Sequence, residues 1–157
     1  MSEPGLTPER FGATAARDRQ VLADAVAAQA MFMVTEDVDD FGVADLLSAG
    51  IAAVNPDLFL SVRVTTAGYA EAVAFLSRGS RTPHRTPDDF HRALGRVHPM
   101  TVTAHQSAFP GTTPLSATHG RPAELFRGSR CLICLRANHV NGLGVCEACV
   151  AGRIGKH

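Results

Sequence analysis

The chain has 157 residues, which allows one ordinary domain, or a domain of about 100 residues with a smaller appendix. With 45% hydrophobic and 19% charged residues it can build a core, which excludes a globally disordered chain. The formal net charge is zero, but residues 1–57 are acidic, and residues 58–157 carry most of the basic side chains and all seven histidines. This asymmetry points to nucleic acid or an acidic partner on the second half, or to an ordinary solvated surface.

The first part of the chain alternates helical and extended patterns. Residues 7–30 predict one helix, because a cap, a proline and an acid open it and apolar residues then recur at helical spacing. Residues 31–35 are a short apolar run that ends in acids, which predicts a buried strand. Residues 43–49 predict a helix that ends at Gly50, and residues 51–54 predict a second strand.

The second part of the chain is predicted to be mainly helical. Residues 55–60 open a helical turn, and residues 66–78 place apolar side chains on one face of a helix. A cap, a proline and two acids start a further helix at Thr86, which we expect to run to about residue 97 and to stop before a proline. Residues 107–128 are rich in proline, glycine, serine and threonine, so we interpret them as a linker.

Nothing in the sequence indicates export or a membrane span. Residues 1–10 are polar, which is unlike a secretory signal. The most apolar stretch, residues 21–34, is too short for a bilayer and carries Asp24. All cysteines lie close to the C-terminal end, and paired cysteines in a chain without an export signal favour metal over disulfide bonds. We therefore expect a cytoplasmic protein with no membrane partner.

The four cysteines form two C-x-x-C pairs, Cys131 with Cys134 and Cys146 with Cys149, separated by eleven residues. Each pair presents two thiolates, and two pairs complete a tetrahedral zinc shell that leaves no open position for substrate. The sequence therefore predicts one structural Zn²⁺. A hairpin with Asn141-Gly142 as its turn and a short helix over residues 147–154 predict a treble-clef or zinc-ribbon arrangement. Redox-active or disulfide cysteines and an iron–sulfur site are the alternatives.

The purpose of this module is open at the level of sequence. Four basic residues surround it, namely Arg130, Arg136, Arg153 and Lys156. Such a set fits a surface that contacts nucleic acid or a partner protein. A purely stabilising role accounts for the module equally well.

A second candidate site consists of acids. Asp18 lies in the first predicted helix, whereas Asp37 and Asp40 follow the first predicted strand. That helix advances about 18 Å beyond Asp18 and the strand returns about 20 Å, so Asp18 and Asp37 reach the same level if the two elements pack antiparallel. Converging carboxylates suit Mg²⁺, which activates water and stabilises charge on a phosphate. Alternatively, Asp18 is a surface helix residue and residues 37–40 form a solvated turn.

The stretch from residue 18 to residue 60 resembles the C-terminal half of a PIN domain. The matching segments are Asp18-Arg19-Gln20-Val21-Leu22-Ala23, Val34-Thr35-Glu36-Asp37, Asp40-Phe41, Gly50-Ile51 and Pro56-Asp57-Leu58-Phe59-Leu60. PIN domains are α/β/α folds with a central parallel sheet, and the family comprises Mg²⁺- or Mn²⁺-dependent ribonucleases, including toxins of toxin–antitoxin pairs. The resemblance implies that Asp18 and Asp37 are metal-site acids, that Asp40 is a substitute for Asp37, and that Thr35 orients the cluster.

The resemblance also implies a domain organisation and an activity. Residues 1–106 are expected to form a partial PIN-like α/β/α fold whose parallel sheet lacks the family's first strand and the Asp that ends it. A linker over residues 107–128 and a zinc module over residues 129–157 follow. The implied activity is metal-dependent hydrolysis of RNA phosphodiesters, impaired by the missing Asp. RNA and an antitoxin-like protein are the implied partners.

Two further expectations complete the interpretation. Residues 31–34 are expected to form an exposed apolar sheet edge, through which copies of the chain associate into a homo-oligomer. The alternative to a ribonuclease is a non-enzymatic zinc-binding module that contacts nucleic acid or protein.

Overall fold

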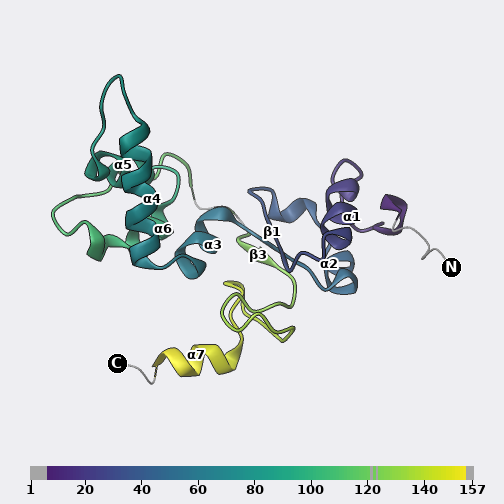
Figure 1. The fold of residues 1–157 in the computed structure, drawn as a ribbon. Coiled ribbons are helices and arrows are strands. Elements are labelled where there is room, and N and C mark those ends of the chain that lie inside the picture. Colours follow the sequence, from purple (N-terminus) through teal and green to yellow (C-terminus); the bar gives the residue numbers. More distant parts are fainter. Residues whose placement is uncertain (1–6, 121, 123, 155–157) are drawn as a thin grey trace. The chain divides into compact units, whose positions relative to one another are not determined.

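A computed structural model describes residues 7–120, 122 and 124–154, which fall into two compact units (Figure 1). Unit 1 combines Met1–Asn55 with Ala123–His157, and unit 2 is Pro56–Pro122. The described residues form seven α-helices, three 3-10 helices and three short strands. The prediction of a mixed α/β fold is therefore confirmed at this coarse level, and the two units are described separately below.

Unit 1 contains the sheet. Its elements are η1 (Pro8–Arg10), α1 (Arg19–Ala27), β1 (Phe32–Val34), η2 (Val38–Asp40), α2 (Val43–Ala49), β2 (Ala52–Val54), β3 (Phe126–Arg127) and α7 (Glu147–Ile154). The strand order is β1-β2-β3, with β1 parallel to β2 and β3 antiparallel to β2. Both predicted strands are confirmed, whereas β3 lies in the segment predicted to be a linker.

Helix α2 makes the parallel crossover between β1 and β2. It ends as predicted at Gly50, whose φ of 68° is the left-handed conformation that glycine adopts without strain. The backbone N–H of Gly50 and that of Ile51 donate to carbonyls in the last turn of α2, which satisfies the end of the helix. Strand β2 follows at once and is completely buried.

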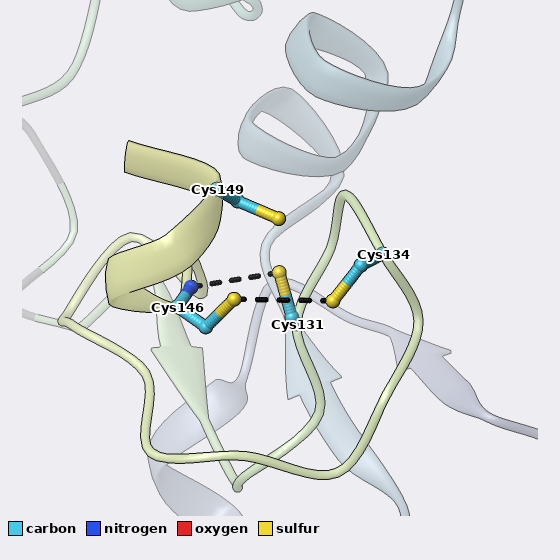
Figure 2. Close-up of side chains that lie close together, drawn as sticks. All are labelled: Cys131, Cys134, Cys146 and Cys149. Atoms are coloured by element: carbon cyan, nitrogen blue, oxygen red, sulfur yellow. Dashed lines mark hydrogen bonds between the residues drawn. The ribbon is translucent and has the colours of Figure 1, made fainter. Parts of the chain in front are cut away.

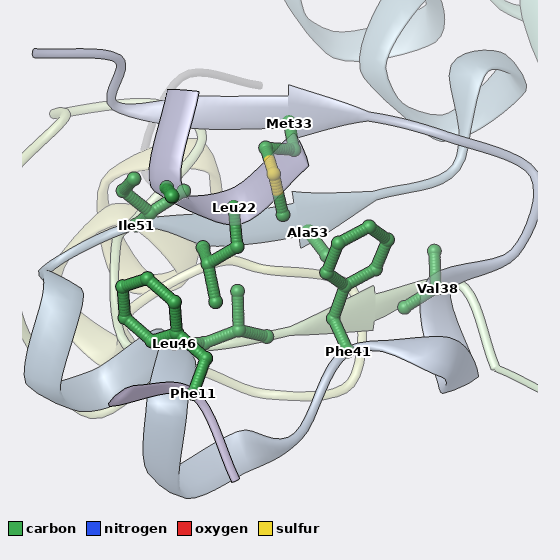
Figure 3. Close-up of a cluster of buried hydrophobic side chains, with 9 residues drawn as sticks. Phe11, Leu22, Met33, Val38, Phe41, Leu46, Ile51 and Ala53 are labelled. Carbon is green, nitrogen blue, oxygen red and sulfur yellow. The ribbon is translucent and has the colours of Figure 1, made fainter. Parts of the chain in front are cut away.

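The core of unit 1 packs α1 and α2 against the sheet (Figure 3). Its buried members are Phe11, Leu22, Ala23, Met33, Val38, Phe41, Leu46, Ile51 and Ala53. Strand β1 lies at one end of the sheet order, and Val34 within it is 49% exposed. Met33 points to the core instead, so only one face of β1 is covered by the described residues.

The prediction of one helix over residues 7–30 is wrong. The structure has a 3-10 turn, η1, and then α1 from residue 19, with an irregular segment between them. Long-range hydrogen bonds hold this segment: the Thr14 N–H donates to the Asp45 carboxylate at 2.7 Å, and the Thr14 hydroxyl accepts from Gly42 N at 3.2 Å. The Ala15 N–H donates to Asp40 O. These contacts replace the helical hydrogen bonds that local sequence favours.

Unit 2 is helical. Its elements are α3 (Pro56–Arg63), α4 (Thr66–Gly79), α5 (Pro87–Leu94), α6 (Pro99–Ala104) and η3 (Gln106–Ala108). Thr86 caps α5 as predicted and forms a reciprocal capping box with Asp89. Helix α5 ends at Leu94 rather than near residue 97, and the proline expected to stop it is the first residue of α6.

Helix α6 is capped from a distant part of unit 2. Its own N-cap residue, His98, makes no side-chain cap. The buried carboxylate of Asp57 in α3 instead accepts hydrogen bonds from Met100 N at 2.9 Å and from Thr101 N at 2.7 Å. The Thr101 hydroxyl donates to the same carboxylate at 2.8 Å. A negative charge at a helix N-terminus is favourable, so Asp57 ties α6 to α3.

Tyr69, Val73 and Phe109 form the core beside α4 and α5. Gln106 donates through Nε2 to two backbone carbonyls, so its Oε1 accepts from His91 Nε2 at 2.9 Å. His91 Nδ1 is then free to accept from the Tyr69 hydroxyl at 2.8 Å. His91 is fully buried and both of its ring nitrogens have partners.

The chain divides differently from the predicted domains. Residues 107–120 and 122, predicted to be part of a linker, belong to unit 2, and Phe109 is buried there. Two backbone hydrogen bonds, from Leu115 N to Arg92 O and from Thr118 N to Arg96 O, hold this segment along α5 and the turn that follows it. Residues 124–128 return to unit 1 and supply β3, while positions 121 and 123 lie outside the described residues.

Candidate metal centre

The first cysteine pair lies on a tight turn that follows β3. Cys131 and its neighbour Leu132 are completely buried, whereas Cys134 is exposed. The Leu135 N–H donates to Cys131 O, and Leu135 has a φ of 65°. The Ile133 N–H points back at the Cys131 sulfur at 3.4 Å. The turn therefore presents both thiol groups on its inner side.

The second pair lies at the start of α7. Cys146 immediately precedes the helix and Cys149 is in its first turn, with Cys149 N and Val150 N donating to Cys146 O. The Cys146 N–H points at the Cys131 sulfur at 3.5 Å. The N-terminus of a helix favours negative charge, which suits cysteines that bind a metal ion as thiolates. The predicted helix after the second pair is confirmed.

The four sulfur atoms converge on one point (Figure 2). They lie within 4.8 Å of one another, and all four cysteines are free of disulfide bonds. The Cys134 and Cys146 sulfurs are 3.8 Å apart. A tetrahedral site with Zn–S bonds of about 2.3 Å has edges of about 3.8 Å, so this spacing fits a zinc ion. The predicted cluster of four cysteines positioned for one metal ion is confirmed.

The thiols carry opposite pKa shifts. Burial raises the pKa of Cys131, but the backbone N–H groups of Cys146, Cys134 and Ile133 outweigh it and lower the pKa to about 6. Hydrogen bonding to Cys146, together with burial and the other two thiols, raises the pKa of Cys149 to about 12. The opposite shifts of Cys131 and Cys149 show that a second thiolate beside Cys131 is unfavourable. A divalent metal supplies the compensating positive charge, and it displaces the thiol protons on binding.

The cysteine cluster is fastened to the sheet of unit 1. The Arg130 side chain donates to Gly50 O at 2.8 and 3.0 Å and to Leu135 O at 2.8 Å. Leu132 N donates to Gly144 O at 2.7 Å, and Gly144 lies against Phe126 of β3. Arg130, predicted to be part of a basic surface, is therefore a structural residue whose guanidinium satisfies backbone carbonyls.

The loop between the cysteine pairs forms a hairpin-like turn. Two isolated antiparallel bridges join Arg130 to Ala137 and Val140 to Cys146. The turn spans Asn141 to Gly144, with the Gly144 N–H donating to Asn141 O. The loop reverses here as predicted, but the turn is longer than the predicted Asn141-Gly142 pair. Its left-handed residue is Gly144, with a φ of 67°.

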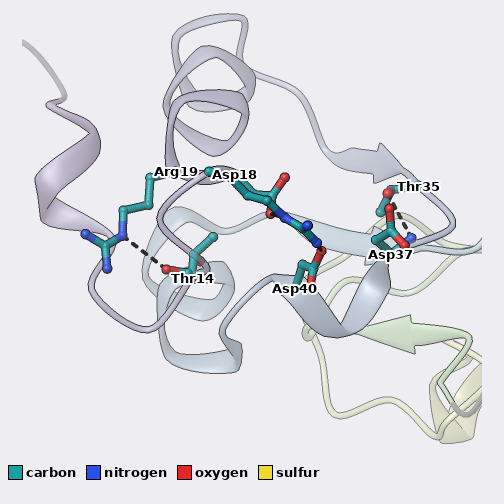
Figure 4. Close-up of polar contacts among 7 residues, drawn as sticks. Thr14, Asp18, Arg19, Thr35, Asp37 and Asp40 are labelled. Carbon is teal, nitrogen blue, oxygen red and sulfur yellow. Dashed lines mark hydrogen bonds and ion pairs between the residues drawn. The ribbon is translucent and has the colours of Figure 1, made fainter.

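Asp18 and Asp40, both labelled in Figure 4, are bridged by the Arg17 guanidinium. The Arg17 guanidinium donates to the Asp18 carboxylate at 3.1 Å and also bonds Asp40. The hydrogen bond to Asp40, followed by that to Asp18, raises the pKa of Arg17. No ion pair is predicted for Arg17 from the sequence, although a basic residue beside a candidate metal-site acid indicates one.

Asp37 and Thr35 lie beyond the end of β1. The Asp37 N–H donates to the Thr35 hydroxyl at 3.1 Å, which fixes the turn that leads into η2. Among the described residues, the four cysteines are the one group of three or more potential ligands close enough to share a metal ion. The acids Asp18, Asp37 and Asp40 do not form such a group. The cation that lies between Asp18 and Asp40 is Arg17.

Comparison with known proteins gives no match: no family model, no curated protein and no solved structure is similar to the chain. These results neither support nor refute the PIN resemblance. None of the helices in the described part of the chain has the length and apolarity needed to cross a membrane.

Proposed function

We propose that Cys131, Cys134, Cys146 and Cys149 hold one structural zinc ion in a treble-clef module. The 3.8 Å separation between the sulfurs of Cys134 and Cys146 carries this proposal, because it equals the edge of a four-thiolate zinc site. A turn, a bridged hairpin and a helix that begins at the second pair support the treble-clef arrangement. Four thiolates close the coordination shell, so the ion stabilises the fold and performs no chemistry on a substrate.

Metal analysis of the purified full chain tests this assignment. We expect one zinc per chain in the wild type and loss of zinc in Cys131→Ser, because three thiolates no longer close the shell. His139→Ala is the matched control, since His139 is exposed in the loop between the pairs and is expected to leave zinc binding intact. Iron in place of zinc, a disulfide between the pairs, or zinc retained in Cys131→Ser refutes the proposal.

We also propose that the chain is a PIN-type ribonuclease, which hydrolyses RNA phosphodiester bonds. This activity is the one that its resemblance to PIN domains implies. The support is positional. Arg17 bonds both Asp18 and Asp40, and Asp40 lies in η2, which follows β1 of the parallel strand pair. Residues beyond the carboxyl ends of such strands often bind ligands in α/β proteins. Asp37 also follows β1. The carboxylates of these residues would contact the metal ion that this reaction needs, Mg²⁺ or Mn²⁺.

The described acids do not fit such an ion as they stand. Two of them share Arg17, whose positive charge opposes a second cation, and they do not gather as a ligand set. This arrangement of Asp18, Asp37 and Asp40 therefore supports no catalytic step through a metal ion. This observation counts against the nuclease and leaves the second candidate function, a non-enzymatic protein that binds RNA or protein through its zinc module.

Cleavage of single-stranded RNA in the presence of Mg²⁺ distinguishes the two candidates. If the chain is a nuclease, Asp18→Asn lowers the rate by about 100-fold or more, while Asp24→Asn, an exposed acid on the same helix, leaves it unchanged. Equal rates in wild type and Asp18→Asn remove Asp18 from the site. RNA binding without cleavage, lost when zinc is chelated, supports the non-enzymatic alternative.

A further inference from the structure

The four cysteines of the candidate metal centre are not equally accessible from solvent. Cys131 and Cys146 are buried, with exposed fractions of 0% and 1%. Cys134 is exposed, and Cys149 is intermediate. Cys134 lies on the turn that follows β3, so an oxidant in solution meets this residue before the others. Hydroperoxides oxidise thiolates, and the most accessible thiolate of a cluster reacts first.

The two buried cysteines differ in what their sulfur atoms contact. The Cys131 sulfur accepts from the Ile133 N–H at 3.4 Å and from the Cys146 N–H at 3.5 Å. The Cys146 sulfur lies 3.8 Å from the sulfur of Cys134, which belongs to the other cysteine pair (Figure 2). Hydrogen bonds from backbone N–H groups stabilise the charge on a sulfur and make it a weaker nucleophile. Cys146 is therefore better placed than Cys131 to attack an oxidised Cys134.

We propose that Cys134 is an oxidation site, at which a hydroperoxide converts the metal centre into a disulfide between Cys134 and Cys146. The starting state rests on the zinc assignment made above. The Cys134 thiolate attacks one peroxide oxygen, the O–O bond breaks, and the leaving hydroxide takes a proton from solvent to become water. The product is a sulfenic acid on Cys134.

The second step forms the disulfide. The Cys146 thiolate attacks the Cys134 sulfur, the S–O bond breaks, and the departing hydroxide is protonated to a second water molecule. Two thiolates are thereby oxidised to one disulfide, while one molecule of hydrogen peroxide is reduced to two of water.

Oxidation exchanges one cross-link between the cysteine pairs for another. A zinc ion joins the turn after β3 to the start of α7, and loss of two thiolates opens its coordination shell and releases it. The new disulfide joins the same two segments, whereas a disulfide within either pair would leave them unconnected. Reduction by a thiol in the presence of zinc restores the centre, so the change is reversible.

One equivalent of hydrogen peroxide added to the zinc-loaded full chain tests the proposal. Zinc release is followed with a chromogenic chelator, and the remaining thiols are alkylated before digestion with trypsin. Trypsin cleaves after Arg130, Arg136 and Arg153, so the two cysteine pairs fall on separate peptides. A disulfide between the pairs therefore cross-links two peptides, whereas a disulfide within a pair leaves each peptide separate.

We expect one zinc ion to be released for each disulfide formed, and fragmentation of the cross-linked peptides to place the bond between Cys134 and Cys146. The control is the same chain oxidised in urea with a metal chelator. Disulfides within the pairs are expected to predominate there, because their loops are much shorter than the one that joins the two pairs. A change of pairing between the two conditions reports the folded geometry.

Four results in the folded chain overturn the proposal. These are disulfides within the pairs, a cross-link between other cysteines, a sulfinic acid at Cys134 without any cross-link, and zinc retained after the disulfide has formed. A chain that is purified without zinc refutes the zinc assignment instead. The peptide map of its reduced and then oxidised form still decides whether Cys134 pairs with Cys146.

Discussion

The hydrogen bonds of Asp57 to α6 predict a large loss of stability when this carboxylate is removed. Asp57 is 7% exposed, and it accepts from two backbone N–H groups and one hydroxyl of α6. A hydrogen bond to a charged acceptor contributes about 1.5–3 kcal/mol, and loss of an N-cap costs about 0.5–2 kcal/mol. Because these terms overlap, we expect Asp57→Ala to lower the free energy of unfolding by about 3 kcal/mol. Asp57→Asn keeps one acceptor oxygen and is expected to cost roughly half as much.

Urea unfolding followed by tyrosine fluorescence measures this effect. Tyr69 is the only tyrosine in a chain without tryptophan, and it lies in the same unit as Asp57. Asp88→Ala is the control, because Asp88 is an exposed acid in the first turn of α5 and is expected to cost less than about 1 kcal/mol. If Asp57→Ala unfolds within about 1 kcal/mol of the wild type, the carboxylate does not hold α6, and the reasoning is refuted.

Two further predictions concern the loop between the cysteine pairs and the core of unit 2. Gly144→Ala is expected to lower the free energy of unfolding by about 2–4 kcal/mol, because φ is 67° and a Cβ would lie 2.6 Å from the Phe126 ring. Gly142→Ala, in open space in the same turn, is expected to be nearly neutral in the same circular-dichroism unfolding experiment. Burial raises the pKa of Tyr69 from 10.0 to about 12, so the folded state retains this proton more tightly than the unfolded state. The contribution of protonated Tyr69 to the free energy of unfolding is therefore fully present below pH 10 and is lost as the pH rises through 12. The ultraviolet absorbance of tyrosinate should titrate near 12 in the folded protein. Titration at the ordinary value in the folded protein would contradict the burial of Tyr69.

The sequence predicts best where the structure is decided locally. Gly50 ends α2 through its own backbone conformation, and Thr86 starts α5 through a capping box with a residue three positions away. The cysteine pairs are equally local, since each C-x-x-C turn sets its own thiol spacing. Periodicity and capping patterns describe such elements well because the interactions span a few residues.

The sequence predicts poorly where distant residues decide the structure. Residues 11–18 lie within the helix predicted over residues 7–30, yet Thr14 bonds Asp45, thirty-one residues away, and α1 begins only at Arg19. Helix α6 begins with a proline and has no side-chain cap from its own N-cap residue. No residue near it in the sequence predicts that the carboxylate of Asp57 caps it. Strand β3 has only two residues and is defined by its pairing with β2. Patterns over a few neighbouring residues cannot predict such distant partners.

The same distinction applies to the candidate acids. The sequence around Asp18 and Asp37 predicts a metal site, but it does not show which neighbouring side chains bond these carboxylates in place of a metal ion. Arg17 is such a competitor, and it bonds both Asp18 and Asp40. Substituting a neutral side chain at Arg17 is therefore the simplest way to learn whether these acids accept a divalent ion.

The position of unit 2 in the chain has a consequence for how the protein is assembled during translation. Strand β2 is made early, but its antiparallel partner β3 follows only after all of Pro56–Pro122. The two chain segments of unit 1 meet on either side of this insertion, where Asn55 N donates to Leu125 O at 2.8 Å. A nascent chain on the ribosome therefore holds an unfinished sheet while the helices of unit 2 form. The four cysteines follow β3 in the chain, so a metal ion bound by them would stabilise the sheet only after β3 has been made.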